Sequence, residues 1–333
     1  MDASEGKPSA APRRICVFLL QLGGPGCIEE IEPFLRNLFE DVLPAPRWIR
    51  PLLARFVARW RADKIAPLYE ALGGGSPLRA NTEAQAVALQ KRLVADGYDA
   101  RVLVCMRYAP PRAVTVLEEA RRDWSDATWV ALPLYPQYSF ATTRSSMEEL
   151  DRLLTTAERS RLVTISAYPD DAAYLDAMAE CVREGLGKFT DAQRGGLELV
   201  FSAHGLPLHL VRQGDPYPQQ IRQTVAGIVA RLESPPSHRT AFQSRMGPVK
   251  WLEPSTVDTI GELGRAGVEN LLVVPVSFVS EHIETLHELD IRLAETARAA
   301  GIKRFERAPT PGARRSFVGA LAALVAQAVG GDQ

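Results

Sequence analysis

Two segments of the sequence place metal-binding and proton-carrying side chains directly after predicted buried strands. In the first, the apolar run Leu197–Phe201 leads into Ser-Ala-His-Gly-Leu-Pro, so His204 lies at the carboxyl end of a strand that Gly205 and Pro207 cannot continue. In the second, the strand Leu271–Val276 is followed by EHIETLHE. A single histidine is usually a hydrogen-bonded structural residue. However, four of the five histidines lie in residues 201–218 and in the second segment, and imidazole and carboxylate groups both bind metals and transfer protons.

The elements around these segments predict an α/β fold. Strands alternate with helices, such as the one from Pro218, which has an apolar face formed by Ile221, Val225, Ile228, Val229 and Leu232. The predicted strands are Ile15–Leu22, Arg101–Met106, Thr128–Pro133, Val163–Ala167, Leu197–Phe201, Thr240–Ser244 and Leu271–Val276. Such repeats form parallel sheets covered by helices on both faces. Because the pattern runs through twice, we expect two similar domains that face each other across a cleft.

Three further stretches could contact a ligand. Gly23–Gly26 follows the first strand, but it is neither GxGxxG nor a P-loop, which does not favour a nucleotide site. Gly73–Pro77 is a tight loop whose backbone could approach a ligand closely. Trp48–Trp60 alternates bulky apolar residues with arginines. It could line an apolar pocket for an anionic ligand, touch a membrane surface, or form an ordinary helix with solvated arginines.

Composition and charge exclude several classes of protein. The chain has 333 residues and a net charge of −1, so nothing indicates nucleic-acid binding. The cysteines are scattered without a CxxC pair, which argues against a disulfide framework or structural zinc and fits a reducing cytoplasm. Residues 1–13 are expected to be a flexible tail and not a signal peptide. Phe317–Val329 is too short to span a bilayer and is expected to be a packed helix.

Eight collinear motifs resemble those of the ferrochelatases, which insert ferrous iron into a porphyrin as the terminal step of haem synthesis. They are LLQLGGPG, IAPLYEALGGGSPL, MRYAPP, LYPQYSFATT, FSAHGLP, GDPYPQ, FQSRMGPVKWLEPST and FVSEHIETLHELD. The resemblance implies two Rossmann-like, chelatase-type domains around a porphyrin cleft. The expected divisions are residues 14–170, residues 171–310, and a C-terminal helix within 311–333 that braces both domains.

The resemblance also implies roles for individual residues. His204 and Glu284 match the metal-site histidine and its partner carboxylate, and Glu288 matches the next acid on that helical face. Arg107 and Tyr108 match a pair that faces the porphyrin. Arg61, Lys64 and Ser76 match groups that hold the porphyrin propionates. Trp251 and Phe278 match aromatic residues around the pocket. Walls such as Phe278, Trp251 and Leu22 could press the macrocycle out of plane, although core packing explains Leu22 equally well.

The chain also departs from the family pattern. Many members continue the acidic series by one more turn, where this chain has Arg292, and some bind a [2Fe–2S] cluster through cysteines, whereas this chain has none after Cys181. We therefore expect no iron–sulfur cluster and no tightly bound cofactor, with Fe²⁺ as a substrate. An alternative assignment makes Glu284 the sole base, with iron delivered on the Arg107–Tyr108 side.

Protoporphyrin IX is the expected porphyrin, because the apolar, arginine-studded segment Trp48–Trp60 suits an apolar macrocycle and a membrane surface. Coproporphyrin III, or another tetrapyrrole accepted by a related chelatase, is the alternative within enzymes. A non-catalytic porphyrin or haem carrier is the alternative outside them. The expected location is the cytoplasm, with peripheral contact to the inner membrane.

Overall fold

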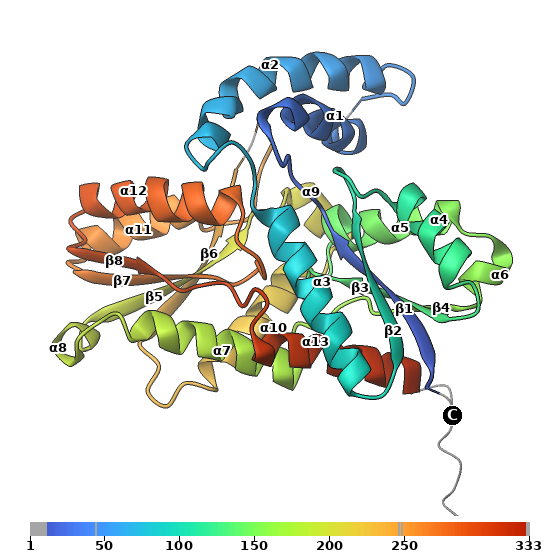
Figure 1. Ribbon diagram of the computed structural model, residues 1–333. Helices are drawn as coiled ribbons and strands as arrows, with labels where there is room; N and C mark the ends of the chain where they lie inside the picture. Colours follow the sequence, from blue (N-terminus) through green and yellow to red (C-terminus); the bar gives the residue numbers. More distant parts are fainter. Residues whose placement is uncertain (1–11, 44, 246, 248, 331–333) are drawn as a thin grey trace, which may run out of the picture.

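Two four-stranded parallel sheets form the framework of the protein (Figure 1). A computed structural model describes residues 12–330 except 44, 246 and 248, so most of the predicted flexible tail, residues 1–11, lies outside the described residues. The first sheet consists of β1 (Arg14–Gln21), β2 (Asp99–Met106), β3 (Thr128–Pro133) and β4 (Leu162–Thr164). The second consists of β5 (Leu197–His204), β6 (Ser237–Gln243), β7 (Asn270–Pro275) and β8 (Arg304–Arg307). The predicted α/β class is confirmed.

The two sheets repeat one topology. Their strand orders are β2-β1-β3-β4 and β6-β5-β7-β8, and all pairs are parallel. In both sheets the order reverses beside the first strand in sequence, which lies between its two successors. In open α/β sheets, ligands bind outside the carboxyl ends of the strands at this switch point. For the second sheet that point lies between the ends of β5 and β7.

Helices cover both sheets and connect their strands. They are α1 (Ile31–Val42), α2 (Arg50–Glu70), α3 (Leu78–Ala95), α4 (Ala113–Asp123), α5 (Ser145–Leu153), α6 (Thr156–Arg159), α7 (Ala172–Leu186), α8 (Asp191–Arg194), α9 (Leu208–Arg212), α10 (Tyr217–Val229), α11 (Thr256–Arg265), α12 (Ala294–Ala299) and α13 (Arg315–Gly330). A 3₁₀ turn covers Ile28–Glu30, and two π-helices cover Phe140–Arg144 and Glu284–Leu293.

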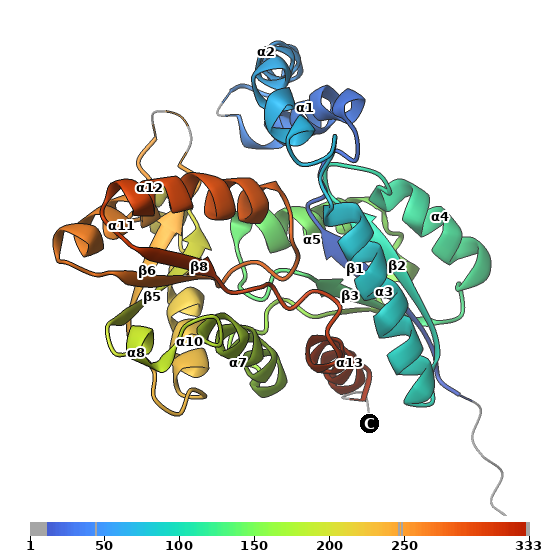
Figure 2. The ribbon, with the colours of Figure 1, turned by 60° about the vertical axis from the view of Figure 1, so that its left-hand side comes forward.

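The C-terminal helix α13 packs between the two halves of the molecule. It contacts α3 and β3 of the first half and α7 of the second (Figures 1 and 2). Its buried side chains, including Phe317, Leu321 and Val325, belong to a core cluster that also contains residues of both sheets. This apolar helix is therefore part of the interior, as its sequence predicts. The division into domains at residues 170 and 310 stays a prediction.

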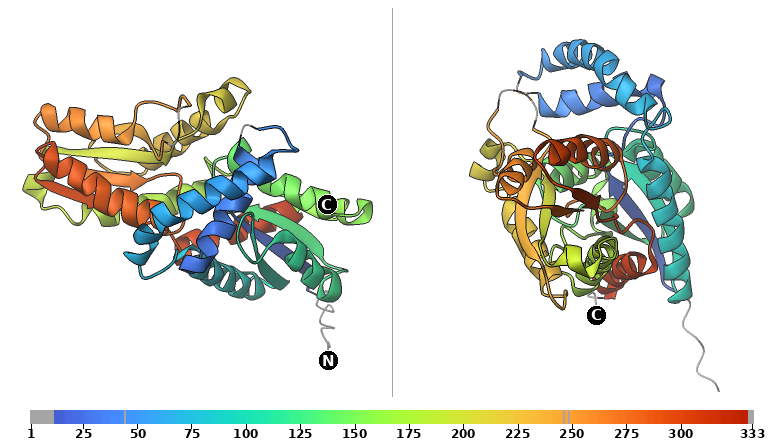
Figure 3. Two further views of the ribbon diagram at one scale, coloured as in Figure 1. Left: turned by 90° about the horizontal axis from the view of Figure 1, so that it is seen from above. Right: turned by 90° about the vertical axis from the view of Figure 1, so that its left-hand side faces the viewer.

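Helices α1 and α2 form a pair that stands above the two sheets (Figures 2 and 3). The pair has a small core of its own, formed around Ile31, Leu35, Phe39 and Ala58. In the described residues, none of the helices combines the length and the apolar character needed to cross a membrane.

All seven predicted strands overlap observed ones, and β8 was not predicted. Strand β8 has no fully buried residue, so its sequence lacks the apolar run on which the prediction relied. Strand β6 begins at Ser237, three residues before the predicted start at Thr240. Ser237, His238 and Arg239 are exposed on an edge strand, so they lack the apolar side chains on which the prediction relied. Strand β5 extends to His204, so this histidine is the last residue of the strand itself.

Candidate active site

His204 is fixed through its backbone at the switch point of the second sheet. Its N–H donates to Ser277 Oγ at 2.9 Å, and its carbonyl accepts from the Tyr217 hydroxyl at 3.0 Å. Ser277 follows β7, and Tyr217 begins α10. Contacts among three separate elements therefore fix the backbone position from which the imidazole ring projects.

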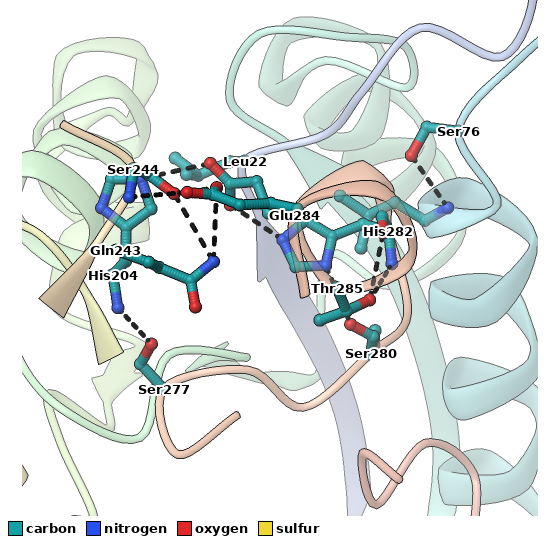
Figure 4. A network of polar contacts seen from close by, with 12 residues as sticks. Leu22, Ser76, His204, Gln243, Ser244, Ser277, Ser280, His282, Glu284 and Thr285 are labelled. Atoms are coloured by element: carbon teal, nitrogen blue, oxygen red, sulfur yellow. Dashed lines mark hydrogen bonds and ion pairs between the residues drawn. The ribbon is translucent and has the colours of Figure 1, made fainter. Parts of the chain in front are cut away.

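Glu284 is the first residue of the second π-helix, and its carboxylate bridges two histidines (Figure 4). Its Oε1 lies 3.1 Å from His204 Nε2, and its Oε2 lies 2.9 Å from His282 Nε2. The His204 and Glu284 side chains remain 39% and 32% exposed. The structure thus brings together two predicted site residues that are 80 positions apart and leaves both accessible to a ligand.

A hydrogen bond fixes the Nδ1 proton of both histidines. His204 Nδ1 lies 2.6 Å from the Gly205 carbonyl oxygen, and His282 Nδ1 lies 3.1 Å from that of Ser280. Because a carbonyl oxygen only accepts hydrogen bonds, each Nδ1 carries a proton. Nε2, which faces the Glu284 carboxylate, is therefore the nitrogen that can exchange its proton for a metal ion.

The electrostatics of the pair favour charge separation in the free protein. Burial disfavours the imidazolium of His204, but the Glu284 carboxylate and its hydrogen bond outweigh burial and raise the pKa of His204 to about 9. Burial likewise opposes ionisation of Glu284, yet His204 and His282 hold the pKa of its carboxyl well below the usual range. A metal ion that binds His204 Nε2 must therefore displace a proton.

Glu288 is held by the loop after β6. Its carboxylate accepts hydrogen bonds from the Ser244 N–H at 2.9 Å and the Ser244 hydroxyl at 2.5 Å. Ser244 has a φ of 64°, a left-handed conformation that is uncommon for residues other than glycine. The prediction placed Glu284 and Glu288 on one helix face, and the segment that carries both is a π-helix with i→i+5 bonding.

Aromatic side chains lie beside the pair. The Phe278 ring centroid is 6.4 Å from that of His204 and 4.7 Å from that of His282. On the other side of β5, a Cβ added to Gly205 would lie 3.2 Å from the Trp251 ring and 2.6 Å from the Gln243 carbonyl oxygen. Glycine at position 205 therefore lets Trp251 approach the end of the strand that carries His204.

Arg107 and Tyr108 follow β2 and lie in a polar network. The Tyr108 hydroxyl donates to Asp41 Oδ2 at 2.6 Å, and Arg107 pairs with Asp41 and Glu149. Burial raises the pKa of Asp41, but hydrogen bonds from Tyr108 and Ser145 outweigh it, so that the pKa falls below its ordinary value. These contacts go to acidic partners that the sequence did not indicate and not to the His204–Glu284 pair.

The three predicted propionate-binding residues lie on α2 and the following loop. Arg61 is half-buried, Lys64 places its ammonium 3.7 Å above the Trp60 ring, and Ser76 Oγ accepts from the Leu78 N–H at the start of α3. A Cβ on Gly75 would lie 2.1 Å from the Gly26 carbonyl oxygen. The two glycine-rich loops therefore pack against each other, which explains the glycine at position 75.

His282 is the residue whose contact with the pair the sequence did not reveal. It contacts Glu284 directly. Its neighbour Ile283 packs against the core of the α1–α2 pair. The clustering of histidines was the available signal, but spacing alone could not separate His282 from His287.

The fold and this site define a chelatase-type α/β protein. One similar solved structure is DR2241 of Deinococcus radiodurans, a multi-domain protein described as structurally similar to chelatases. The likeness has a TM-score of 0.51 at 16% identity and covers 96% of this chain and 56% of that one. At so low an identity, it supports a conclusion about the fold alone.

Sequence comparisons give the family. The Ferrochelatase family model matches residues 14–329. Relatives named ferrochelatase include those of Geotalea uraniireducens, 44% identical over 96% of this chain and 100% of the relative, and Gloeobacter violaceus, 45% identical over 94% and 97%. The chain belongs to the ferrochelatase family. The predicted family and enzyme class, a lyase of haem biosynthesis that inserts ferrous iron into a porphyrin, are confirmed.

Proposed function

We propose that the protein inserts Fe²⁺ into protoporphyrin IX, with His204 and Glu284 as the metal pair. The observation that carries the assignment is the 3.1 Å contact between His204 Nε2 and Glu284 Oε1. The two side chains come from different elements at a switch point, and both remain accessible. A histidine and a carboxylate suit ferrous iron, and only two protein ligands would bind it weakly enough to pass it on.

His204 also serves as the acceptor of a pyrrole proton. Free-base porphyrin releases two protons when iron enters, and the imidazole can take one of them once its Nε2 has given up its own proton. Glu284 can pass a proton to His282 at 2.9 Å or outward toward Glu288. We propose no extension of this path to position 292, because that residue is an exposed arginine.

The porphyrin would lie beside this pair, with Phe278 and Trp251 as walls and Arg61, Lys64 and Ser76 as groups for its propionates. Arg107 and Tyr108 would face the ring from the first sheet. Asp41, which both of them contact, also borders a cavity of about 570 Å³ lined by Glu40, Arg47, Arg50, Pro51, Glu148 and Arg152. That opening supports the alternative in which iron arrives on the Arg107–Tyr108 side and Glu284 is the sole base.

Peripheral contact with an anionic membrane surface is part of the proposal. Trp48, Leu52, Phe56 and Trp60 are spaced by four residues and are 53–81% exposed, so they form one apolar stripe along α2 and the turn before it. Arg55 and Arg59 are exposed on the same helix. Apolar and cationic side chains together suit a lipid surface with negative headgroups.

We propose no tightly bound cofactor and no [2Fe–2S] cluster. Cys16, Cys105 and Cys181 are buried in separate elements, and burial raises the pKa of each thiol to about 12. Iron–sulfur clusters need thiolates, so this chemistry supports the proposal. A cytoplasmic location and the lack of a nucleic-acid partner stay predictions.

The test is metalloporphyrin formation by the purified protein. Fe²⁺ or Zn²⁺ is supplied with protoporphyrin IX or coproporphyrin III, and initial rates are compared. We expect insertion with a preference for protoporphyrin. A preference for coproporphyrin would identify the protein as a coproporphyrin III ferrochelatase. A shifted Soret band without insertion of either metal would indicate a porphyrin carrier.

A further inference from the structure

Helix α3 is hydrogen-bonded to residues 279–281, the segment that precedes Glu284 of the metal pair. Gln85 of α3 is fully buried, and its Nε2 donates to the carbonyl oxygens of Val279 and Gly312, each at 3.0 Å. Its Oε1 accepts from Ser280 Oγ at 2.9 Å. One turn earlier, Asn81 Nδ2 donates to the Glu281 carbonyl oxygen at 3.0 Å. A helix of the first half therefore holds residues 279–281, which follow β7 of the second.

A continuous chain of hydrogen bonds runs from Gln85 to His204. The Ser280 carbonyl contacts His282 Nδ1 at 3.1 Å, and His282 Nε2 contacts Glu284 Oε2 at 2.9 Å (Figure 4). The other oxygen of Glu284 contacts His204. We infer that Gln85 is a positioning residue for the metal pair, which sets the orientation of His282 and Glu284 through Ser280. The inference rests on the proposed function of that pair.

The chemistry at this position requires an amide. Two backbone carbonyls need donors and one hydroxyl needs an acceptor, and a glutamine side chain supplies both kinds of group. Glutamate would keep the acceptor for Ser280 but present oxygen to two carbonyls, and methionine would leave all three groups without a partner. Buried polar groups rarely stay unpaired, so the 279–281 segment would shift and carry His282 with it.

The inference predicts a selective effect on the metal. Loss of a group that orients metal ligands typically lowers metal affinity or activity by 10–100-fold. We therefore expect Gln85→Met to raise the KM for Zn²⁺ by about tenfold or more, with the Kd for metal-free porphyrin unchanged. Gln85→Glu should behave like Gln85→Met. Ser280→Ala, which removes one hydroxyl, should act in the same direction with a smaller factor.

The chain offers a matched control in the same helix. Gln90 also uses its side-chain amide, but its Oε1 accepts from the Val102 N–H of β2 at 3.1 Å. Gln90→Met removes a comparable hydrogen bond and leaves the 279–281 segment untouched. It should therefore leave the KM for Zn²⁺ unchanged, even if the melting temperature falls.

The experiment measures initial rates of Zn²⁺ insertion into protoporphyrin IX by the full chain, and porphyrin Kd by tryptophan quenching. A raised KM for Zn²⁺ at unchanged porphyrin Kd in the Gln85 variants, absent from Gln90→Met, supports the inference. An unchanged KM, or a change in Gln90→Met of the same size, overturns it. If the Gln85 variants do not fold, Ser280→Ala decides in the same way. A wild-type chain that inserts no metal would overturn the proposed function and the inference with it.

Discussion

The hydrogen bonds that fix the position of His204 do not involve Nε2, the atom proposed to take part in the reaction. The backbone N–H, the backbone carbonyl and Nδ1 are all hydrogen-bonded to other groups, at Ser277, Tyr217 and Gly205. Only Nε2 faces the Glu284 carboxylate. Because the two backbone contacts do not need the imidazole, a substitution at this residue should change the reaction much more than the fold.

We predict that His204→Ala lowers the rate of iron insertion by about 10²-fold or more, the range expected when a general base is removed. Its circular dichroism and melting temperature should stay close to wild type. The matched control is His238→Ala, a histidine on the neighbouring strand β6 whose ring packs against Phe201. Wild-type turnover by His204→Ala would remove the residue from the metal pair.

Acidification should weaken metal binding. Because Glu284 raises the pKa of His204 to about 9, each pH unit below that value should raise the KM for the metal by about tenfold. The contribution of His204 to folding stability has the opposite dependence, since it is present below pH 6.5 and lost as the pH rises through about 9.

Glu284→Gln provides the internal check, because removal of the carboxylate should return the His204 pKa toward its ordinary value. NMR titration of the histidine Cε1–H resonances measures this directly. A metal KM that stays constant between pH 5 and 8 would argue against His204 as ligand or base.

Sequence patterns could place His204 and the segment EHIETLHE at one edge of the sheet, because both follow apolar strands and parallel strands end at a common edge. Only the family resemblance singled out Glu284 within that segment. The sequence could not assign His282, whose contact with Glu284 depends on the local backbone of residues 280–284. Nor could it anticipate Asp41 as the partner of Tyr108, because these residues are 67 positions apart and Asp41 is one of many acids on a surface helix.

At the scale of elements, a π-helix carries two of the proposed site residues. Glu284 and Glu288 both belong to Glu284–Leu293, and π-helices are rare and occur often at functional sites. A periodicity of four residues predicts a helix here but not which kind. Within this helix, Glu284 contacts His204 while Glu288 holds Ser244.

The stripe on α2 gives a prediction at this scale. Leu52→Glu combined with Phe56→Glu should weaken binding to anionic phospholipid vesicles by about tenfold or more, because each apolar side chain of this size contributes about 1.5–3 kcal/mol when buried. Co-sedimentation measures the effect, and turnover of detergent-solubilised porphyrin should not change.

Val114→Glu on α4 is the matched control, since Val114 is also an exposed apolar helix residue at 51%. Replacing anionic with zwitterionic vesicles should weaken wild-type binding, because arginines near a charged surface each contribute about 1 kcal/mol. Equal vesicle binding by the double variant and the wild type would contradict a membrane role for α2.

At the scale of the molecule, one topology is used twice and the site lies at the switch point of the second copy. The sequence predicted the repeated units because buried parallel strands are apolar along their length. Only the family resemblance implied a C-terminal brace, because the pattern of strands and helices cannot predict how the halves are joined. That depends on α13, whose side chains fill the space between α3 and α7, and on polar contacts such as those of Gln85.

This shared core predicts that the two halves unfold together. Phe317 of α13 is fully buried, and its ring lies 6.3 Å from that of Tyr174 on α7. Phe317→Ala should cost about 3–5 kcal/mol of the free energy of unfolding. Because α13 contacts both halves, hydrogen exchange of β3 and β5 amides should become faster to the same extent. Gln327→Ala, at an exposed position of the same helix, should change neither. If β5 kept its protection while β3 lost it, the halves would be independent folding units, and a site built from both would need a ligand to hold them in register.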